Sequence, residues 1–134
     1  MDAVICCPLV QGAESFLQRW AQRYALFLAS GTPEEELIQI VARRNLAHLF
    51  QGVYGAPRTK DRIIEEILRT RGWRPQQAVV IGDSMTDCLA AAAFDVPFIG
   101  RVRPGEVNPF AATDGVPTVA DLDELARRWE QLAA

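Results

Sequence analysis

Histidine and cysteine, the residues that most often bind zinc or form disulfides, are scarce in this sequence. The 134 residues include one histidine, His48, and three cysteines, Cys6, Cys7 and Cys88. The cysteine count is odd and no C-x-x-C spacing occurs, which argues against a disulfide framework and against a zinc site. We therefore expect free thiols and a location in the reducing cytoplasm.

Long hydrophobic runs and an excess of basic charge are also absent. The longest apolar stretches fall well short of the roughly 18–20 residues that a membrane-spanning helix needs. Residues 1–10, MDAVICCPLV, lack a basic leader and a clear cleavage site, so we expect no signal peptide. The 14 basic and 17 acidic residues give a net charge of −3, so neither nucleic acid nor an anionic membrane is an expected partner.

The order of apolar and amphipathic segments predicts the fold class. No internal repeat, low-complexity segment or Gly/Ser/Pro-rich linker divides the chain, so one domain over residues 1–134 is expected. Short apolar runs alternate with helical patterns, which indicates an α/β fold with a mostly parallel sheet. We expect strands at 24–30, 52–56, 77–82, 96–100 and 116–120, and helices at 13–22, from 33, at 58–71, at 84–94 and from 121.

The second helix has a strong start signal in TPEEEL, residues 32–37. Thr32 is expected to be the N-cap residue and Pro33 the first residue of the helix. The helical spacing then predicts that Leu37, Ile38 and Val41 face the core.

Functional residues are expected just after the strands, because sites in parallel sheets lie at the carboxyl ends of the strands. Ser30 and Gly31 follow the strand at 24–30, where a hydroxyl beside free N–H groups suits a phosphate; the alternative is an ordinary helix cap. Lys60 stands near the start of its helix, where its charge opposes the helix dipole unless an anion is near; the alternative is a solvated lysine. Arg101 and Arg103 follow the strand at 96–100 and either guide an anion or are solvated.

A pair of aspartates follows the apolar strand in VVIGDSMTD, residues 79–87. Asp83 stands at the strand tip, and Asp87 lies one helical turn later on the same side. Oxygen ligands on a loop and a first helical turn suit Mg²⁺, which keeps several waters and uses few carboxylates. The alternative is that both aspartates only stabilise the start of the helix.

Taken in order, these strand ends resemble the motifs of the haloacid dehalogenase-like hydrolase superfamily. LFLASGTP is similar to the second motif, GAPRTKDRII to the third and VVIGDSMTD to the fourth. The similarity extends over residues 9–110, and PLVQGAESFL resembles the segment that re-enters the core after the cap domain of phosphatase members. The resemblance implies a three-layer α/β/α Rossmann-like core.

The resemblance also implies a phosphoryl-transfer mechanism. In the family an aspartate attacks phosphorus to form an aspartyl-phosphate, and a second aspartate two residues later is the general acid/base. Ser30, Gly31 and Lys60 would then bind phosphate, and Asp83 and Asp87 would hold Mg²⁺.

The family's first motif, a strand followed by D-x-D-x-T, has no match in this sequence. Asp2 is the only aspartate before Ser30, and no strand precedes it. Losing that central strand would expose two strand edges, so we hypothesise that residues 3–7, AVICC, replace it and bring Cys6 or Cys7 near the place of the nucleophile. Two small buried thiols are the alternative. The sequence also has no room for the substrate-selecting cap domain.

Three interpretations of function follow. The chain is a Mg²⁺-dependent phosphatase whose nucleophile lies elsewhere, an inactive relative that binds a small phosphorylated metabolite or a protein, or a structural remnant that forms a homodimer. We favour a truncated hydrolase fold, a pseudoenzyme with little or no activity of its own.

Overall fold

The computed structural model describes residues 1–7, 14–113 and 115–132, and six parallel strands form one sheet in it. The strand order is β3-β2-β1-β4-β5-β6, and every neighbouring pair is parallel. The predicted α/β class is confirmed. The strands are β1 (Ala3–Cys6), β2 (Ala25–Pro33), β3 (Gly52–Ala56), β4 (Ala78–Gly82), β5 (Phe98–Arg101) and β6 (Thr118–Val119).

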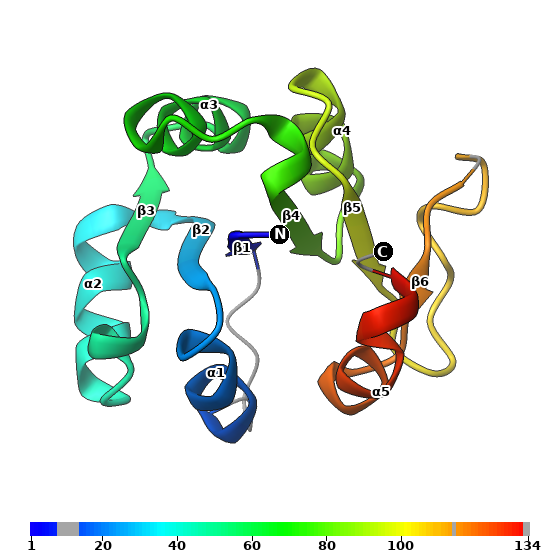
Figure 1. Ribbon diagram of the computed structural model, residues 1–134, viewed down its shortest axis with the longest axis horizontal. Coiled ribbons are helices and arrows are strands. Elements are labelled where there is room, and N and C mark those ends of the chain that lie inside the picture. The colour runs from blue at the N-terminus through cyan, green and yellow to red at the C-terminus, as the bar shows by residue number, and fades with distance from the viewer. Residues whose placement is uncertain (8–13, 114, 133–134) are drawn as a thin grey trace.

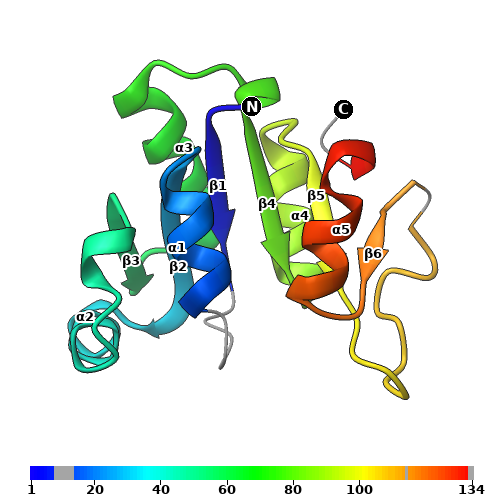
Figure 2. The same ribbon diagram turned by 60° about the horizontal axis from the view of Figure 1, so that its bottom comes forward.

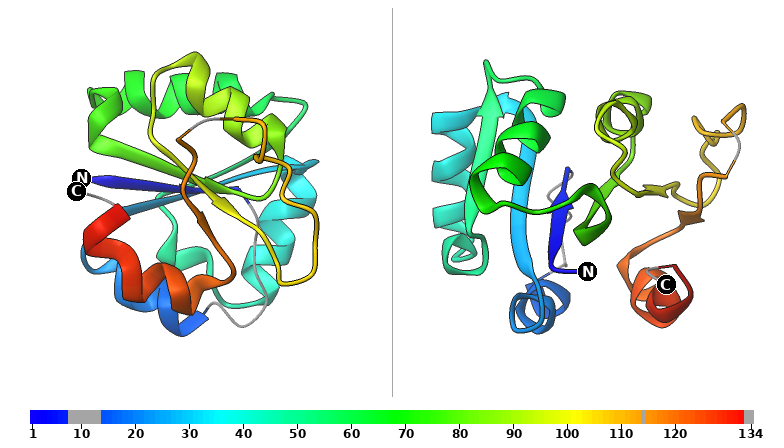
Figure 3. Two further views of the ribbon diagram at one scale, coloured as in Figure 1. Left: turned by 90° about the vertical axis from the view of Figure 1, so that its right-hand side faces the viewer. Right: turned by 45° about the horizontal axis from the view of Figure 1, so that its top comes forward.

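Helices cover both faces of the sheet and complete a three-layer arrangement (Figures 1 and 3). Buried side chains of α1, α2 and α5 form one core cluster, and those of α3 and α4 form a second cluster on the opposite face. The described elements all belong to this sheet and its flanking helices, and none forms a cap-like unit. The helices are α1 (Glu14–Ala21), α2 (Glu34–Arg43), α3 (Lys60–Arg71), α4 (Met85–Ala93) and α5 (Leu122–Leu132), with short 3₁₀ turns η1 (Ala47–Leu49) and η2 (Pro75–Gln77). No helix within the described ranges is long and apolar enough to cross a membrane.

Strand β1 lies in the centre of the sheet, which confirms the hypothesis that residues 3–7 replace the family's first strand. It pairs with β2 on one side and with β4 on the other. Ile5 is fully buried, and the N–H of Cys7 continues the pairing by donating to the carbonyl of Ile81 at 2.9 Å. The segment PLVQGAESFL, compared above with the re-entry segment, falls mostly on residues 8–13, which lie outside the described residues.

The predicted start of the second helix is wrong by one residue. Strand β2 continues through Pro33, and α2 begins at Glu34 without a side-chain cap. The cause is tertiary pairing: β2 resumes contact with β3 after an irregularity between Ala29 and Pro33, and the Glu34 carboxylate accepts the N–H of Gly55 at 3.2 Å. Thr32 therefore lies in an extended segment rather than at a helix terminus.

The predicted core face of α2 is correct only in part. Leu37 and Val41 are buried, but Ile38 is 49% exposed. The helix therefore presents a narrower apolar stripe to the sheet than the sequence pattern predicts.

The chain order changes direction between β1 and β4. From β1 the chain proceeds outward to β2 and β3, and it then crosses back to build β4, β5 and β6 on the other side. Such a switch in direction separates the loops that follow the two central strands, and ligands of open α/β sheets bind there. Figure 2 shows the arrowheads of β1 and β4 side by side at this edge.

The central position of β1 generates a stability prediction. Replacing Ile5 by alanine should lower the free energy of unfolding by about 2–5 kcal/mol, because loss of the fully buried side chain would leave a cavity between the sheet and the helices α3 and α4. The matched change Ile38→Ala, at the half-exposed position of α2, should cost under ~1 kcal/mol. Urea denaturation followed by circular dichroism measures both, and equal losses would contradict the central role of β1.

Candidate functional site

Asp87 is the organising residue at the carboxyl end of β4. Its side chain is fully buried, and one carboxylate oxygen, Oδ2, accepts the backbone N–H groups of Asp83 at 3.1 Å and Ser84 at 3.2 Å. The hydroxyl of Ser84 accepts the N–H of Asp87 in return at 3.3 Å, which completes a capping box at the start of α4. The carboxylate thereby fixes the loop between β4 and α4.

Glycine is required at position 82 by this arrangement. A Cβ atom built on Gly82 would lie 2.5 Å from Oδ2 and 2.6 Å from the Cβ of Asp87. The buried carboxylate therefore occupies the space that any other residue would need.

Lys60, the only lysine of the chain, supplies the positive charge beside Asp87. Its ammonium donates to the second carboxylate oxygen, Oδ1, and forms an ion pair in which the side chains are 20% and 0% exposed. Burial alone would lower the pKa of Lys60, but the hydrogen bond and charge of Asp87 outweigh burial and raise it. The predicted conflict between this lysine and the helix dipole is therefore offset by a buried anion.

Cys7 is the thiol that enters this site, because side chains alternate between the two faces of a strand. Cys6 belongs to the core cluster under α1 and α5, whereas Cys7 belongs to the cluster under α3 and α4. Burial first, and then the charge of Asp87, raises the pKa of Cys7 well above its ordinary value; burial raises that of Cys6 to about 12. Cys7 is therefore a protonated thiol at neutral pH.

Asp83 differs from Asp87 in being exposed. Its carboxylate forms no ion pair within the described ranges, although its charge contributes to the raised pKa of Lys60. Lys60, Asp83, Asp87 and Cys7 thus lie together at one edge of the sheet, as the rule on strand ends predicts.

Ser30 and Gly31 follow at the end of the neighbouring strand, β2. The hydroxyl of Ser30 accepts the N–H of Thr32 at 3.1 Å, and no hydrogen bond joins it to Lys60 in the described part of the chain. Both residues lie in the extended backbone of β2. The helix whose N-terminus was expected to hold a phosphate here, α2, begins only at Glu34, three residues after Gly31.

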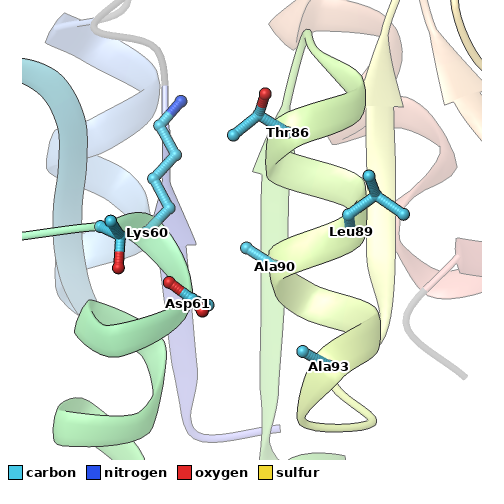
Figure 4. Close-up of a pocket in the computed structure, with 7 residues that line it drawn as sticks. Lys60, Asp61, Thr86, Leu89, Ala90 and Ala93 are labelled. Carbon is cyan, nitrogen blue, oxygen red and sulfur yellow. The ribbon is translucent and has the colours of Figure 1, made fainter.

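A shallow pocket of about 270 Å³ opens beside Lys60, between the first turn of α3 and one side of α4 along its length (Figure 4). Its walls are mostly apolar. The lining residues are Thr59, Lys60, Asp61, Thr86, Leu89, Ala90 and Ala93.

The donor set does not fit a tightly held Mg²⁺. Both oxygens of Asp87 are engaged by protein donors, and the third group at the site is a thiol, a poor ligand for a hard cation. Among the residues that the structure describes, no group of three or more histidine, cysteine or acidic side chains is close enough to hold a metal. Metal binding by Asp83 and Asp87 stays a prediction. Of the two carboxylates, that of Asp83 is the exposed one and forms no ion pair within the described ranges.

Known proteins resemble this chain in sequence and in fold. A family model described as haloacid dehalogenase-like hydrolase matches residues 6–101, more than half of the chain. No curated protein matches the chain as a sequence relative.

Solved structures share the fold. A protein described as a predicted phosphatase from Clostridium acetobutylicum has a TM-score of 0.79 and 23% identity, over 91% of this chain and 60% of its own. A hydrolase of the haloacid dehalogenase-like family from Streptococcus pneumoniae has a TM-score of 0.74 and 21% identity, over 88% and 59%. A hydrolase of the same superfamily from Ehrlichia chaffeensis has a TM-score of 0.73 and 18% identity, over 92% and 58%. The chain therefore spans about three-fifths of the length of these structures, and the low identity establishes a shared fold only.

The ion pair between Lys60 and Asp87 generates a prediction for stability. A double-mutant cycle with Lys60→Met and Asp87→Asn should give a coupling free energy of about 0.5–3 kcal/mol, because either single change leaves one partner without its counter-charge. The control is the exposed pair Arg62 and Glu65, 3.5 Å apart, whose cycle should give about 0.5 kcal/mol or less. Urea denaturation of the seven proteins provides the values, and similar coupling in both cycles would refute the special role of the buried pair.

Proposed function

Because this chain belongs to the haloacid dehalogenase-like hydrolase family, we propose that it binds phosphate at the Lys60 site but hydrolyses phosphate esters slowly or not at all. The observation that carries the proposal is Cys7. A buried, protonated thiol ends β1 beside the ion pair of Lys60 and Asp87, at the place where the family resemblance expects an attacking aspartate.

Lys60 is the main phosphate ligand in this proposal. An ammonium group has three donors, and Lys60 uses one of them on Asp87. Ser30 accepts the N–H of Thr32 and retains its own hydroxyl proton to donate. Gly31 is exposed, and no atom lies within 4 Å of the position that a Cβ would take, so an anion can approach its backbone. A small phosphorylated metabolite is the proposed ligand.

The same residues explain why turnover is expected to be slow. A thiolate, not a thiol, attacks an electrophile, and the raised pKa keeps Cys7 protonated at neutral pH. Transfer of that proton to Asp87 would neutralise the carboxylate and break its ion pair with Lys60.

Magnesium belongs to the family's chemistry, where it neutralises phosphate charge. Here Asp83 offers one open carboxylate, so we expect Mg²⁺ to bind weakly at most. For the location we retain the cytoplasm as a proposal, because Cys6, Cys7 and Cys88 are all free thiols.

The proposed function predicts binding without turnover. Inorganic phosphate at 100 times its dissociation constant should stabilise the protein by roughly 2.7 kcal/mol. Lys60→Ala should abolish this stabilisation, whereas Arg62→Ala, an exposed basic side chain on the same helix, should preserve it. Thermal unfolding measures the effect, and the Cε resonance of ¹³C-labelled lysine reports directly on the only lysine side chain.

The matching activity assay uses p-nitrophenyl phosphate with Mg²⁺. We expect the same rate for the unaltered chain and for Lys60→Ala and Asp83→Asn. Robust hydrolysis that both substitutions abolish would overturn the proposal of an inactive relative, and an absence of phosphate binding would overturn the proposal of a phosphate site.

The thiol at position 7 generates a separate prediction about the metal. Cys7→Asp adds a hard carboxylate beside Asp83 and Lys60, so Mg²⁺ should stabilise this variant by roughly 2.7 kcal/mol at 100 times its dissociation constant. Cys7→Ser, which removes the sulfur without adding charge, should show no such response. Thermal unfolding with and without Mg²⁺ distinguishes them, and equal stabilisation of the unaltered chain would show that the carboxylate is not the missing ligand.

A further inference from the structure

Arginines gather at the amino-terminal edge of the sheet, the edge opposite the Lys60 site. The segments 15–24, 39–51 and 67–77 end α1, α2 and α3 and lead to the starts of β2, β3 and β4. These segments contain seven arginines and no acidic residue. Because the helices run back against parallel strands, all three segments lie where the strands begin; in Figure 2 this is the upper edge, where β1 and β4 start beside the N-terminus.

Hydrogen bonds connect the three segments along this edge. The guanidinium of Arg71 donates to the side-chain oxygen of Gln51 at 2.6 Å, and the N–H of Gln51 donates to the carbonyl of Leu26 at 2.8 Å. The end of α3 therefore contacts the starts of β3 and β2. The N–H of Asp2 donates to the carbonyl of Gln77 at 2.7 Å, which joins the start of β1 to that of β4.

Six of these arginines are exposed and have no acidic partner, and we call them the arginine edge. None of the six forms an ion pair with an acidic side chain in the described part of the chain. The expectation of no nucleic-acid partner rests on the net charge of −3, which does not describe how charge is distributed. The arginine edge comprises Arg23, Arg43, Arg44, Arg69, Arg71 and Arg74.

Helix dipoles explain only part of this concentration of charge. A cation in the last turn of a helix is stabilised by the dipole, which accounts for Arg43, Arg69 and Arg71. Arg23 and Arg74 lie outside the α-helices, however, and α4 and α5 have no basic residue in their last turns. The half of the edge next to α1, α2 and α3 is therefore more basic than the helix ends alone require.

The composition of this surface favours nucleic acid over a protein or a membrane. Among the exposed large hydrophobic residues described, only Met1 lies at this edge. A protein interface needs apolar anchors at its centre, and a membrane-binding surface inserts apolar side chains. Nucleic-acid interfaces are instead polar and positively charged. Gln22, Asn45 and Gln76 stand exposed between the arginines, and their amides can donate to phosphate and sugar oxygens.

We propose that the arginine edge binds the sugar–phosphate backbone of a nucleic acid. A guanidinium binds phosphate oxygens through paired hydrogen bonds, and each phosphate contact releases a counterion from the nucleic acid. The contacts are to the backbone, so the binding is independent of base sequence. RNA and DNA share this chemistry. The surface lies at the opposite end of the strands from Lys60, so the inference does not depend on the proposed phosphate site.

The test measures fluorescence anisotropy of a labelled RNA strand and a labelled DNA duplex over a range of salt concentrations. Six phosphate contacts predict a slope of about −4 to −5 for the logarithm of the association constant against the logarithm of salt concentration. The triple variant Arg43→Gln, Arg44→Gln and Arg69→Gln should make this slope shallower by about 2–3. Replacing the same three arginines by lysine retains the charges and should retain the slope.

A matched control separates this surface from net charge. The triple variant Arg62→Gln, Arg103→Gln and Arg127→Gln alters three exposed arginines outside the arginine edge and changes the net charge by the same amount. It should keep the slope of the unaltered chain. Lys60→Ala should likewise leave the affinity for both nucleic acids unchanged.

The outcomes decide between the possible partners. Binding of either nucleic acid with the expected salt dependence supports the proposal, and the tighter of the two identifies the ligand. An absence of binding, or equal losses in the two glutamine triple variants, overturns it. Loss of binding in Lys60→Ala assigns the nucleic acid to the phosphate site and also overturns the role of the arginine edge. Tighter binding of polyglutamate or of phosphatidylserine vesicles overturns it in favour of an acidic protein or a membrane.

Discussion

The buried ion pair between Lys60 and Asp87 is the interaction on which the site depends. Asp87 is the one charged side chain among the fully buried residues described, and removing a carboxylate from water is unfavourable unless charges and donors compensate it. Lys60 provides the charge from α3, and two backbone N–H groups after β4 provide the donors. One carboxylate therefore joins α3, α4 and the loop after β4, so the geometry at this edge of the sheet and the packing of that face share one cause.

Strand β1 determines what chemistry this geometry can perform. Its backbone completes the sheet, and its alternation directs Cys7 toward the ion pair while Cys6 faces the opposite core. The scaffold of a hydrolase therefore surrounds a thiol. Burial and the charge of Asp87 raise the pKa of this thiol well above its ordinary value, so it is protonated at neutral pH.

The sequence predicted the strands and the helices, because these depend on local periodicity, and it predicted which polar residues meet at one edge of the sheet, because these residues follow the strands. Lys60, Asp83 and Asp87 lie close together because each comes shortly after the carboxyl end of a parallel strand. The start of α2 was wrong because the pairing of β2 with β3 extends the strand past Thr32, and no local signal reports that pairing. Ile38 was misplaced because the width of a buried stripe depends on the neighbouring layer. The choice between Cys6 and Cys7 required the register of β1, and the Nε atom of Arg101, buried without a hydrogen-bond partner in the described part of the chain, reflects tertiary packing with no signature in the sequence.

The central place of β1 has a consequence for the order of folding. Its partner β4 lies far along the chain: Asp2, beside β1, is hydrogen-bonded to Gln77, beside β4, across a separation of 75 residues. Contacts of such high sequence separation slow folding, because the intervening chain must be ordered before they form. During synthesis, β1 can pair only with β2 until β4 emerges from the ribosome, and its other edge stays open for that interval. An unpaired edge next to apolar residues favours association with other chains during that interval.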